Sequence, residues 1–343
     1  MILSSSPSTA LQIYGNSFYF IKKHLIFLVI SFLVFFIGFL VPFQLWKKHS
    51  FNLIILTIFL LLLTYIPGVS HTAGGASRWI NLGFFAFQPS EFAKFTIILY
   101  FATAVSNRNK SRLDIKKDLV PILGVIGFIC LLIVKQPSLS STLMIAFTVM
   151  LMLIASNISL RFLFSTVFGG FFVVLMYIQT NPYQLKRVKA FMNPWLDPLG
   201  IGFHTIQSLI SVGSGGLFGR GIGNSRQKFF YLPQQYTDFI FSIICEELGF
   251  ILSTGIILLY LMLSFRGFKI ASQIEDNFGK LLAVGITSWI SMQAILNIGV
   301  VLSVIPVTGQ PLPFISYGGT SLMMLLFAIG VLSNVSKYRD HHK

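Results

Sequence analysis

The sequence has little charge, few acidic side chains and almost no cysteine. Only 10% of its 343 residues are charged and only 10 are Asp or Glu, whereas about 25% of the residues in soluble domains are charged. Because 55% of the residues are hydrophobic, we predict an integral membrane protein. Cys130 and Cys245 lie in apolar stretches, so neither a disulfide framework nor a cysteine metal site is expected. Both are predicted to be small buried side chains.

Several motifs of soluble enzymes are also absent. The sequence contains no Walker or Rossmann phosphate loop, no Ser-His-Asp order and no metal-binding histidine cluster. Energy from nucleotide hydrolysis is therefore not expected. The first twenty residues lack a basic region followed by a full apolar core, so no signal peptide is predicted. Membrane topology and anionic headgroups account for the net charge of +15, and nucleic acid is not expected as a partner.

The chain contains instead many apolar runs that are long enough to cross a hydrocarbon layer of ~30 Å at ~1.5 Å per residue. No internal repeat and no linker marks off a soluble domain. We therefore predict one all-α, polytopic membrane domain over residues 1–343. Its nine spans are expected at 24–41, 51–66, 91–106, 119–134, 139–156, 161–178, 239–265, 281–302 and 317–335.

The orientation follows from Lys and Arg, which collect in short connections on the cytoplasmic side. If the N-terminus lies outside, fourteen of the 25 basic residues fall on the inner side. The long segment 179–238 then faces away from the cytoplasm as a large extracytoplasmic loop. The inner residues are Lys47, Lys48, Arg108, Lys110, Arg112, Lys116, Lys117, Arg161, Arg266, Lys269, Lys280, Lys337, Arg339 and Lys343.

The outer loop contains a glycine-rich run from Gly213 to Gly223, which includes Ser214 and Arg220 and is followed closely by Arg226 and Lys228. Glycines permit close backbone approach, and a run of free N–H groups can cradle phosphate oxygens. The alternative is a glycine-rich turn in a re-entrant loop.

The outer loop ends in Asp238, immediately before the next apolar run. A carboxylate at the water-filled mouth of a span can act as a general base, or it can cap the helix that follows. Glu246 and Glu247 lie about two helical turns, or ~12 Å, deeper in the span. We therefore interpret them as structural groups that are hydrogen-bonded to their neighbours.

Two further connections carry polar motifs. In 67–90, Arg78-Trp79 suits an anionic headgroup that bears a sugar, although Trp79 also fits an ordinary aromatic belt. Glu91 and Lys94 are three residues apart on one helix face and form either a structural ion pair or a substrate contact. In 307–321, prolines and glycines break the helix at membrane depth, so this loop is expected to line the same cavity as Asp238.

These motifs together resemble the SEDS proteins, the family of FtsW, RodA and SpoVE. The resemblance covers nearly the whole chain, and 227–233 is more similar to the division or sporulation type than to the elongation type. The motifs that carry it are Arg78-Trp79-Ile80, Gln88-Pro89-Ser90-Glu91, Asp197-Pro198 with Gly200, Gln207-Ser208, Gly213-Ser214-Gly215-Gly216, Thr237-Asp238-Phe239-Ile240-Phe241, Glu246-Glu247-Leu248-Gly249 and Pro313-Phe314-Ile315-Ser316-Tyr317-Gly318-Gly319.

The resemblance implies a peptidoglycan glycosyltransferase that polymerises lipid II at the outer face of the bacterial plasma membrane. It works with a class B penicillin-binding transpeptidase and other division proteins, and the family's essential Asp falls on Asp238. The leaving pyrophosphate then needs Arg78, Arg220, Lys228 or a divalent cation, Mg²⁺ or Mn²⁺, and no other cofactor is expected. The remaining candidate substrate-binding residues are Trp79, Gln88, Ser90, Glu91, Lys94, Gln207, Ser214, Thr237, Ser316 and Gly318.

Two departures from the family pattern stand out. Residues 1–16 resemble only the end of the family's usual first helix and the loop after it, so nine spans are expected in place of ten. Gln234-Gln235-Tyr236 stands where the family commonly has a Glu and a His before Thr-Asp. A lipid II flippase and a weakly active scaffold for a transpeptidase stay open as alternatives. The composition also leaves an endosymbiont or plastid membrane open as the location.

Overall fold

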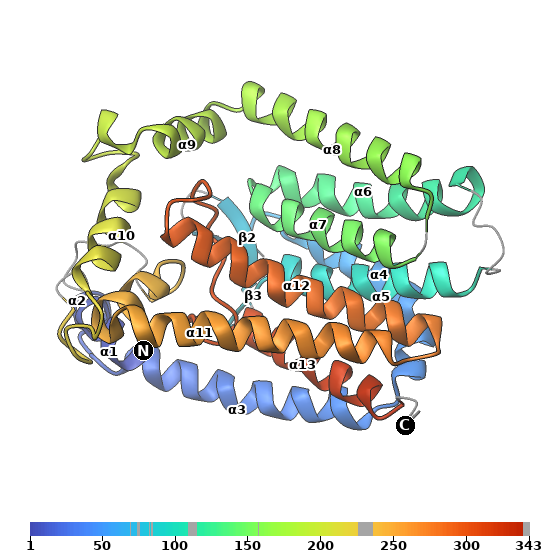
Figure 1. The fold of residues 1–343 in the computed structure, drawn as a ribbon, viewed down its shortest axis with the longest axis horizontal. Coiled ribbons are helices and arrows are strands. Elements are labelled where there is room, and N and C mark those ends of the chain that lie inside the picture. The colour runs from blue at the N-terminus through green and yellow to red at the C-terminus, as the bar shows by residue number, and fades with distance from the viewer. Residues whose placement is uncertain are drawn as a thin grey trace. The chain divides into compact units, whose positions relative to one another are not determined.

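The computed structural model describes residues 1–68, 70–73, 76–81, 83, 85–108, 115–156, 158–225 and 236–338, and most of them are helical (Figure 1). The short N-terminal helices are α1 (Ile2–Ser5) and α2 (Pro7–Tyr14). The longer helices are α3 (Tyr19–Leu40), α4 (Phe43–Leu63), α5 (Pro89–Ser106), α6 (Val120–Lys135), α7 (Leu139–Ala155), α8 (Leu160–Thr180), α9 (Pro182–Met192), α10 (Phe203–Ser214), α11 (Ile240–Ser272), α12 (Asn277–Val301) and α13 (Gly319–Ser336).

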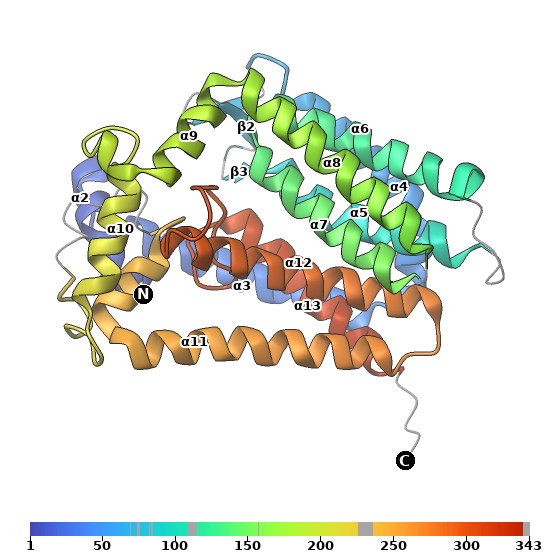
Figure 2. The same ribbon diagram turned by 45° about the horizontal axis from the view of Figure 1, so that its top comes forward.

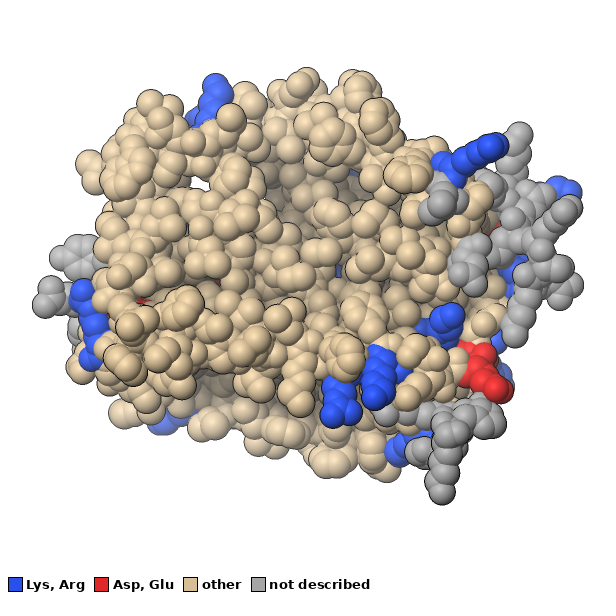
Figure 3. Space-filling model, viewed as in Figure 1, with Lys and Arg blue, Asp and Glu red and all other residues tan. Residues whose placement is uncertain are grey.

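Each of the nine predicted spans corresponds to one helix, namely α3 to α8 and α11 to α13. Within the described residues, seven of these are long and apolar enough to cross a membrane, whereas α7 is a shorter apolar helix and α5 carries a charged pair. Helices are expected here because a span in hydrocarbon has to pair its own backbone groups. In Figure 3 the charged side chains gather mainly toward the right-hand end of the drawn face, and its middle is almost free of them, as a lipid-facing surface requires. The prediction of a polytopic helical membrane protein is confirmed.

The described chain forms two compact units that interleave along the sequence. The first unit comprises Met1–Leu28, Ser165–Met262 and Gln293–Gly319. The second comprises Val29–Phe164, Leu263–Met292 and Thr320–Lys343. Since each unit is built from three separate stretches, neither is a contiguous segment, and the single domain over 1–343 stays a prediction.

In the second unit, α5 packs against α4, α6 and α7, and α6 and α7 lie side by side in both ribbon views (Figures 1 and 2). A small antiparallel sheet, which the sequence did not predict, precedes α5 in the order β1-β2-β3. Its strands are β1 (Ser70–Ala73), β2 (Ala76–Asn81) and β3 (Ala86–Phe87). Ser70 pairs with Ile80, and Ile80 pairs with Phe87. The sheet places Arg78 and Trp79 on its central strand.

In the first unit, α11 is interrupted at Gly249, whose φ of 73° and ψ of −174° are not helical. The glycine-rich segment pairs the backbone groups that this break exposes. The N–H groups of Arg220 and Gly221 donate to the carbonyls of Glu246 and Glu247, each at 3.0 Å. On the other side of the break, Phe250 N donates to Gly216 O at 2.9 Å and Ile251 N donates to Leu217 O at 3.2 Å. The re-entrant turn is therefore the interpretation of the glycine run that these contacts favour.

Glycine is required where the two segments cross. A Cβ atom at Gly249 would clash with the backbone nitrogen of Gly219, and one at Gly219 would clash with the carbonyl of Glu247. Both glycines also have positive φ values, 73° and 79°. The close approach lets one backbone complete the hydrogen bonding of the other inside the apolar region.

We expect Gly249→Ala to destabilise the protein, because the new Cβ meets backbone and the left-handed conformation alone costs about 1–3 kcal/mol in a non-glycine residue. Gly255→Ala is the matched control, since Gly255 lies in the same helix and a Cβ atom there would have no neighbouring atom within 4 Å. The thermal midpoint of the purified protein in detergent measures the difference. Equal midpoints for the two variants would contradict the requirement for close backbone approach.

Candidate functional site

Asp238 lies in the turn 236–239 that precedes α11, and its side chain is partly exposed. The next residue, Phe239, is only 2% exposed and stacks on His204 of α10 at 5.8 Å between ring centroids. Burial lowers the pKa of His204, and Arg187 lowers it further, which favours a neutral imidazole beneath this turn. The turn is thereby anchored on one side by an apolar contact, while the Asp238 side chain stays accessible.

The segment 302–318 between α12 and α13 is irregular, as its prolines and glycines predict. Ser303, Gly309 and Phe314 have positive φ values of 54°, 71° and 62°. The side-chain amides of α12 satisfy part of this backbone. Gln293 Nε2 donates to Pro311 O at 2.9 Å, and Asn297 Nδ2 donates to Gln310 O at 2.7 Å. Irregular backbone at this depth is stable only when protein groups pair it in this way.

The irregular segment lies directly against the Asp238 turn. Ser316 Oγ donates to Thr237 O at 2.6 Å, and Tyr317 N donates to Tyr236 O at 2.9 Å. A Cβ placed at Gly309 would lie 3.4 Å from Asp238 Oδ2, so the carboxylate faces the Gly309 backbone. The structure thus brings together Thr237, Asp238 and Ser316.

Aromatic rings form one wall of this turn. Phe20 of α3 lies 4.7 Å from the Tyr236 ring and 5.3 Å from the Tyr317 ring, and the two tyrosine rings are 5.8 Å apart. Burial raises the pKa of Tyr236, and the nearby Tyr14 raises it further, so the Tyr236 hydroxyl keeps its proton at neutral pH. Of the predicted departure at 234–236, only Tyr236 is among the described residues.

A second polar cluster in the same unit surrounds Glu246, whose side chain is fully buried. Its carboxylate accepts hydrogen bonds from Ser225 Oγ at 2.6 Å and from Ser211 Oγ at 3.3 Å, and it lies 3.6 Å from the guanidinium of Arg220. Arg220 Nε also donates to the carbonyl of Ser214 at 3.1 Å. Arg220 keeps 34% of its side chain exposed.

The other carboxylate of this motif, Glu247, is 1% exposed and accepts a hydrogen bond from Ser4 Oγ. Gln207 is half-buried on α10, and its neighbour Ser208 is hydrogen-bonded to Ser242 of α11 at 2.7 Å. These contacts tie α1 and α10 to the first part of α11. The contacts of Glu246 and Glu247 are therefore structural, and none of those named here involves the Asp238 turn.

The remaining candidates belong to the second unit. Arg78 donates to the carbonyls of Gln136, at 2.9 Å from Nε, and of Pro137, so it ties β2 to the connection between α6 and α7. Glu91 and Lys94 form an ion pair of 2.6 Å, with each side chain 2% exposed. Because both side chains are buried, the structure favours a structural ion pair over a substrate contact.

Further contacts surround this ion pair and the residues next to it. Lys94 lies 5.6 Å from the centre of the Trp289 ring. Ser90 is 2% exposed, and the backbone N–H of Gln88 donates to Thr320 Oγ1 at 3.4 Å. Trp79 is half-buried.

Some of the predicted residues lie outside the described part of the chain. They are Arg226, Lys228, the rest of the motif 227–233, Gln234 and Gln235.

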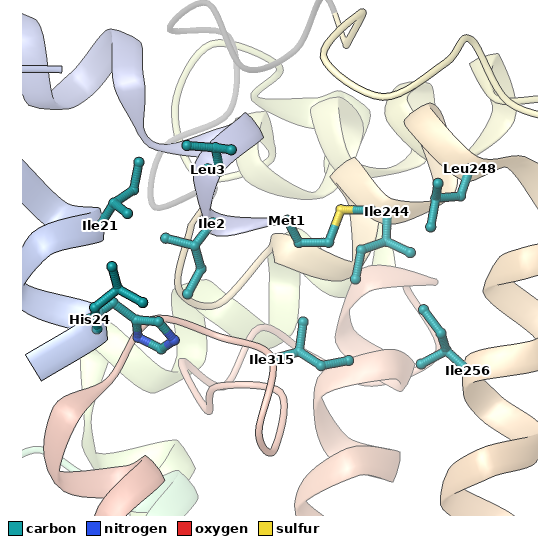
Figure 4. A pocket seen from close by; sticks show the side chains of 10 residues that line it. Met1, Ile2, Leu3, Ile21, His24, Ile244, Leu248, Ile256 and Ile315 are labelled. Atoms are coloured by element: carbon teal, nitrogen blue, oxygen red, sulfur yellow. The ribbon is translucent and has the colours of Figure 1, made fainter. Parts of the chain in front are cut away.

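One cavity of the first unit, of about 420 Å³, lies close to the aromatic wall of the Asp238 turn, since His24 lines it and its ring is 6.0 Å from the Tyr317 ring, but Asp238 does not line it (Figure 4). Among the side chains that line it, the His24 imidazole is polar and the others are apolar. No carboxylate of the described residues lines it. The lining residues are Met1, Ile2, Leu3, Ile21, His24, Leu25, Ile244, Leu248, Ile256 and Ile315.

Sequence reasoning missed Gln293 and Asn297, the two amides that hold the irregular segment. They lie four residues apart on one face of an apolar helix, and polar side chains in a span deserve a functional hypothesis.

The described residues contain no group of three His, Cys, Asp or Glu side chains that could hold a metal. A single carboxylate such as Asp238 still suits Mg²⁺, which is often bound by one or two carboxylates together with substrate phosphates. Metal binding therefore stays a prediction.

Comparison with known proteins agrees with the resemblance seen in the motifs. A family model described as "Cell cycle protein", for FtsW, RodA and SpoVE, matches residues 1–341. Stage V sporulation protein E of Bacillus subtilis is 44% identical, over 98% of this chain and 92% of that protein. A probable peptidoglycan glycosyltransferase FtsW of Trichlorobacter lovleyi is 38% identical, over 98% of this chain and 88% of that protein.

Solved structures agree with this at the level of the fold. A chain from a structure described as "Structural coordination of polymerization and crosslinking by a peptidoglycan synthase complex" has a TM-score of 0.78 and 27% identity, and the match covers 99% of this chain and 96% of that one. The rod shape determining protein RodA of Thermus thermophilus has a TM-score of 0.71 at 24% identity, over 99% of this chain and 94% of that one. This chain therefore belongs to the FtsW, RodA and SpoVE family of integral membrane proteins.

Proposed function

We propose that Asp238 is the general base with which this chain polymerises a lipid-linked disaccharide, lipid II, into glycan strands. The class of enzyme follows from the family, since relatives 35–38% identical over almost the whole chain are named as peptidoglycan glycosyltransferases. The observation that supports the base is the placement of a partly exposed carboxylate against the backbone of Gly309. A general base has to reach its substrate, and Glu246 and Glu247 are buried.

In the proposed reaction, Asp238 accepts the proton of the 4-hydroxyl of the acceptor GlcNAc. The oxygen forms a bond to the anomeric carbon of the donor MurNAc. The bond from that carbon to the pyrophosphate oxygen breaks, and undecaprenyl pyrophosphate leaves with the bonding electron pair. The new glycosidic bond lengthens the strand, and the proton stays on Asp238 until solvent removes it.

Arg220 is the described cation of the first unit best suited to the leaving pyrophosphate. Its contacts with Glu246 and Ser214 use part of the guanidinium, which has five N–H donors. Donors on the exposed side can bind phosphate oxygens, for which charge-assisted bonds are strong. If Mg²⁺ or Mn²⁺ binds, Asp238 and the phosphates would hold it, and the cation would neutralise charge on the pyrophosphate.

The proposal includes a partner and a location. One solved relative belongs to a complex that couples polymerization and crosslinking, so we infer that this chain works beside a class B penicillin-binding transpeptidase. We place it in the plasma membrane with 179–238 on the outer side, as the Lys and Arg distribution indicates. Division or sporulation is the proposed role, since the relatives include both FtsW and stage V sporulation protein E.

Asp238→Asn is expected to lower the rate of lipid II polymerisation by at least ~10²-fold, because general-base catalysis contributes about 10²–10⁴-fold. The measurement uses labelled lipid II and the purified protein with its transpeptidase. Asp197→Asn is the control. Asp197 is another outer carboxylate, which accepts hydrogen bonds from the N–H groups of Gly200 and Ile201 at 3.0 and 3.1 Å. Asn keeps one of these two acceptor oxygens, so the control should retain most of its activity.

The same assay separates the alternatives. Wild-type rates in Asp238→Asn would reject the base assignment. Lipid translocation without polymer in the unaltered protein would favour a flippase. Absence of both, with transpeptidase binding intact, would favour a scaffold.

Arg220→Gln is expected to lower kcat/KM about 10- to 100-fold, which corresponds to the about 1.5–3 kcal/mol of a hydrogen bond to a charged group. Arg220→Lys should recover part of this loss because it keeps the charge. Lys186→Gln removes an exposed cation of α9 in the same loop and should have little effect. A thermal midpoint for each variant separates the loss of the Glu246 contact from a loss of phosphate binding. Full activity in a folded Arg220→Gln variant would assign the pyrophosphate to other groups.

A further inference from the structure

Asn297 joins two segments that meet at the carboxylate of Asp238. Its side-chain Nδ2 donates to the backbone carbonyl of Asp238 and to that of Gln310, each at 2.7 Å. Asn297 is 1% exposed and lies on α12, in a helix that is otherwise mostly apolar. A buried amide in such a span is costly unless it makes its hydrogen bonds. Both contacts of the Nδ2 group are short and are made to backbone.

The two carbonyls belong to the two segments that meet where the Asp238 carboxylate faces the Gly309 backbone. Asp238 bears the carboxylate, and Gln310 follows Gly309, whose backbone the carboxylate faces. A single amide group therefore fixes both the residue that carries the carboxylate and the backbone against which that carboxylate lies. The bonds from Ser316 to Thr237 and from Tyr317 to Tyr236 fix the residues before Asp238 but not Asp238 itself.

We propose that Asn297 is a positioning residue, which sets the place of the Asp238 carboxylate relative to the segment 302–318. The proposal rests on the proposed function of Asp238 as the base. A displacement of a reacting group by about 1 Å can cost ~10²-fold in rate. Loss of this amide therefore acts on the chemical step and leaves substrate binding largely unchanged.

The first test compares two substitutions in α12. Asn297→Leu removes both donors at similar volume and is expected to lower kcat about 10- to 100-fold with KM within about twofold. Ser291→Ala is the matched control. It removes the contact of Ser291 with Ser264 at 2.6 Å and its bond to Thr287 O at 2.7 Å, and neither bond reaches the Asp238 turn. Equal kcat values for the two variants would overturn the proposal, and so would a loss confined to KM.

The second test needs no polymerase activity. Asp238→Cys, in a chain whose Cys130 and Cys245 are replaced by alanine, reports the position of side chain 238 through its alkylation rate, which depends on the access and surroundings of the thiol. Adding Asn297→Leu should change this rate about fivefold or more, whereas adding Ser291→Ala should not. An unchanged rate with Asn297→Leu would overturn the proposal. If Asn297→Leu does not fold, Asn297→Gln, which keeps the amide one methylene further out, should change the rate in the same direction.

The outcomes also separate this inference from the proposed function. Wild-type polymerisation by Asp238→Asn would reject the base, while the alkylation rates would still decide whether Asn297 positions residue 238. Normal alkylation in the Asn297→Leu background, together with an inactive Asp238→Asn, would keep the base and reject the positioning residue.

Discussion

The structure depends on one constraint, that every backbone N–H and C=O group at membrane depth has to find a partner within the protein. Continuous helices meet it by themselves. Among its described residues, the first unit meets it without a continuous helix at Gly249 and in the segment 302–318. At Gly249 the partner is the backbone of the glycine-rich run, and in 302–318 the partners include the side-chain amides of Gln293 and Asn297. The second of these breaks carries the contact with Asp238.

Charge in the apolar region follows a related rule, since a buried charge is stable only when it is paired or hydrogen-bonded. Glu246 has two serine hydroxyls and the Arg220 guanidinium, and Glu91 has Lys94. Removing one member of such a pair leaves the other uncompensated and costs about 3–5 kcal/mol. Each of these clusters therefore compensates a charge within its own unit.

The sequence predicts the nine helices well because a span in hydrocarbon has a strong local signal, a long apolar run. It also identifies the break at 302–318, since prolines and glycines interrupt a run by themselves. The break at Gly249 has no such signal, because one glycine inside an apolar run is common, and its partner lies about thirty residues earlier in the chain. Asn297 escaped notice for a similar reason. Its role depends on two backbone carbonyls that only the tertiary structure brings close to it. The short strands at Arg78 and Trp79 also form by pairing with other strands, and the hydrophobic periodicity of the sequence does not show that pairing.

The two kinds of carboxylate in α11 and its preceding turn show why chemistry belongs at the mouth of the span. Glu246 is fully buried, and its hydrogen bonds with Ser211 and Ser225 favour one fixed structural state. A group held in that way cannot meet a sugar hydroxyl without breaking buried contacts. Asp238 precedes the helix, is partly exposed and is located by a contact of its backbone carbonyl with Asn297. A general base benefits from this arrangement, because the contact sets its position through the backbone and not through the carboxylate oxygens that accept the proton.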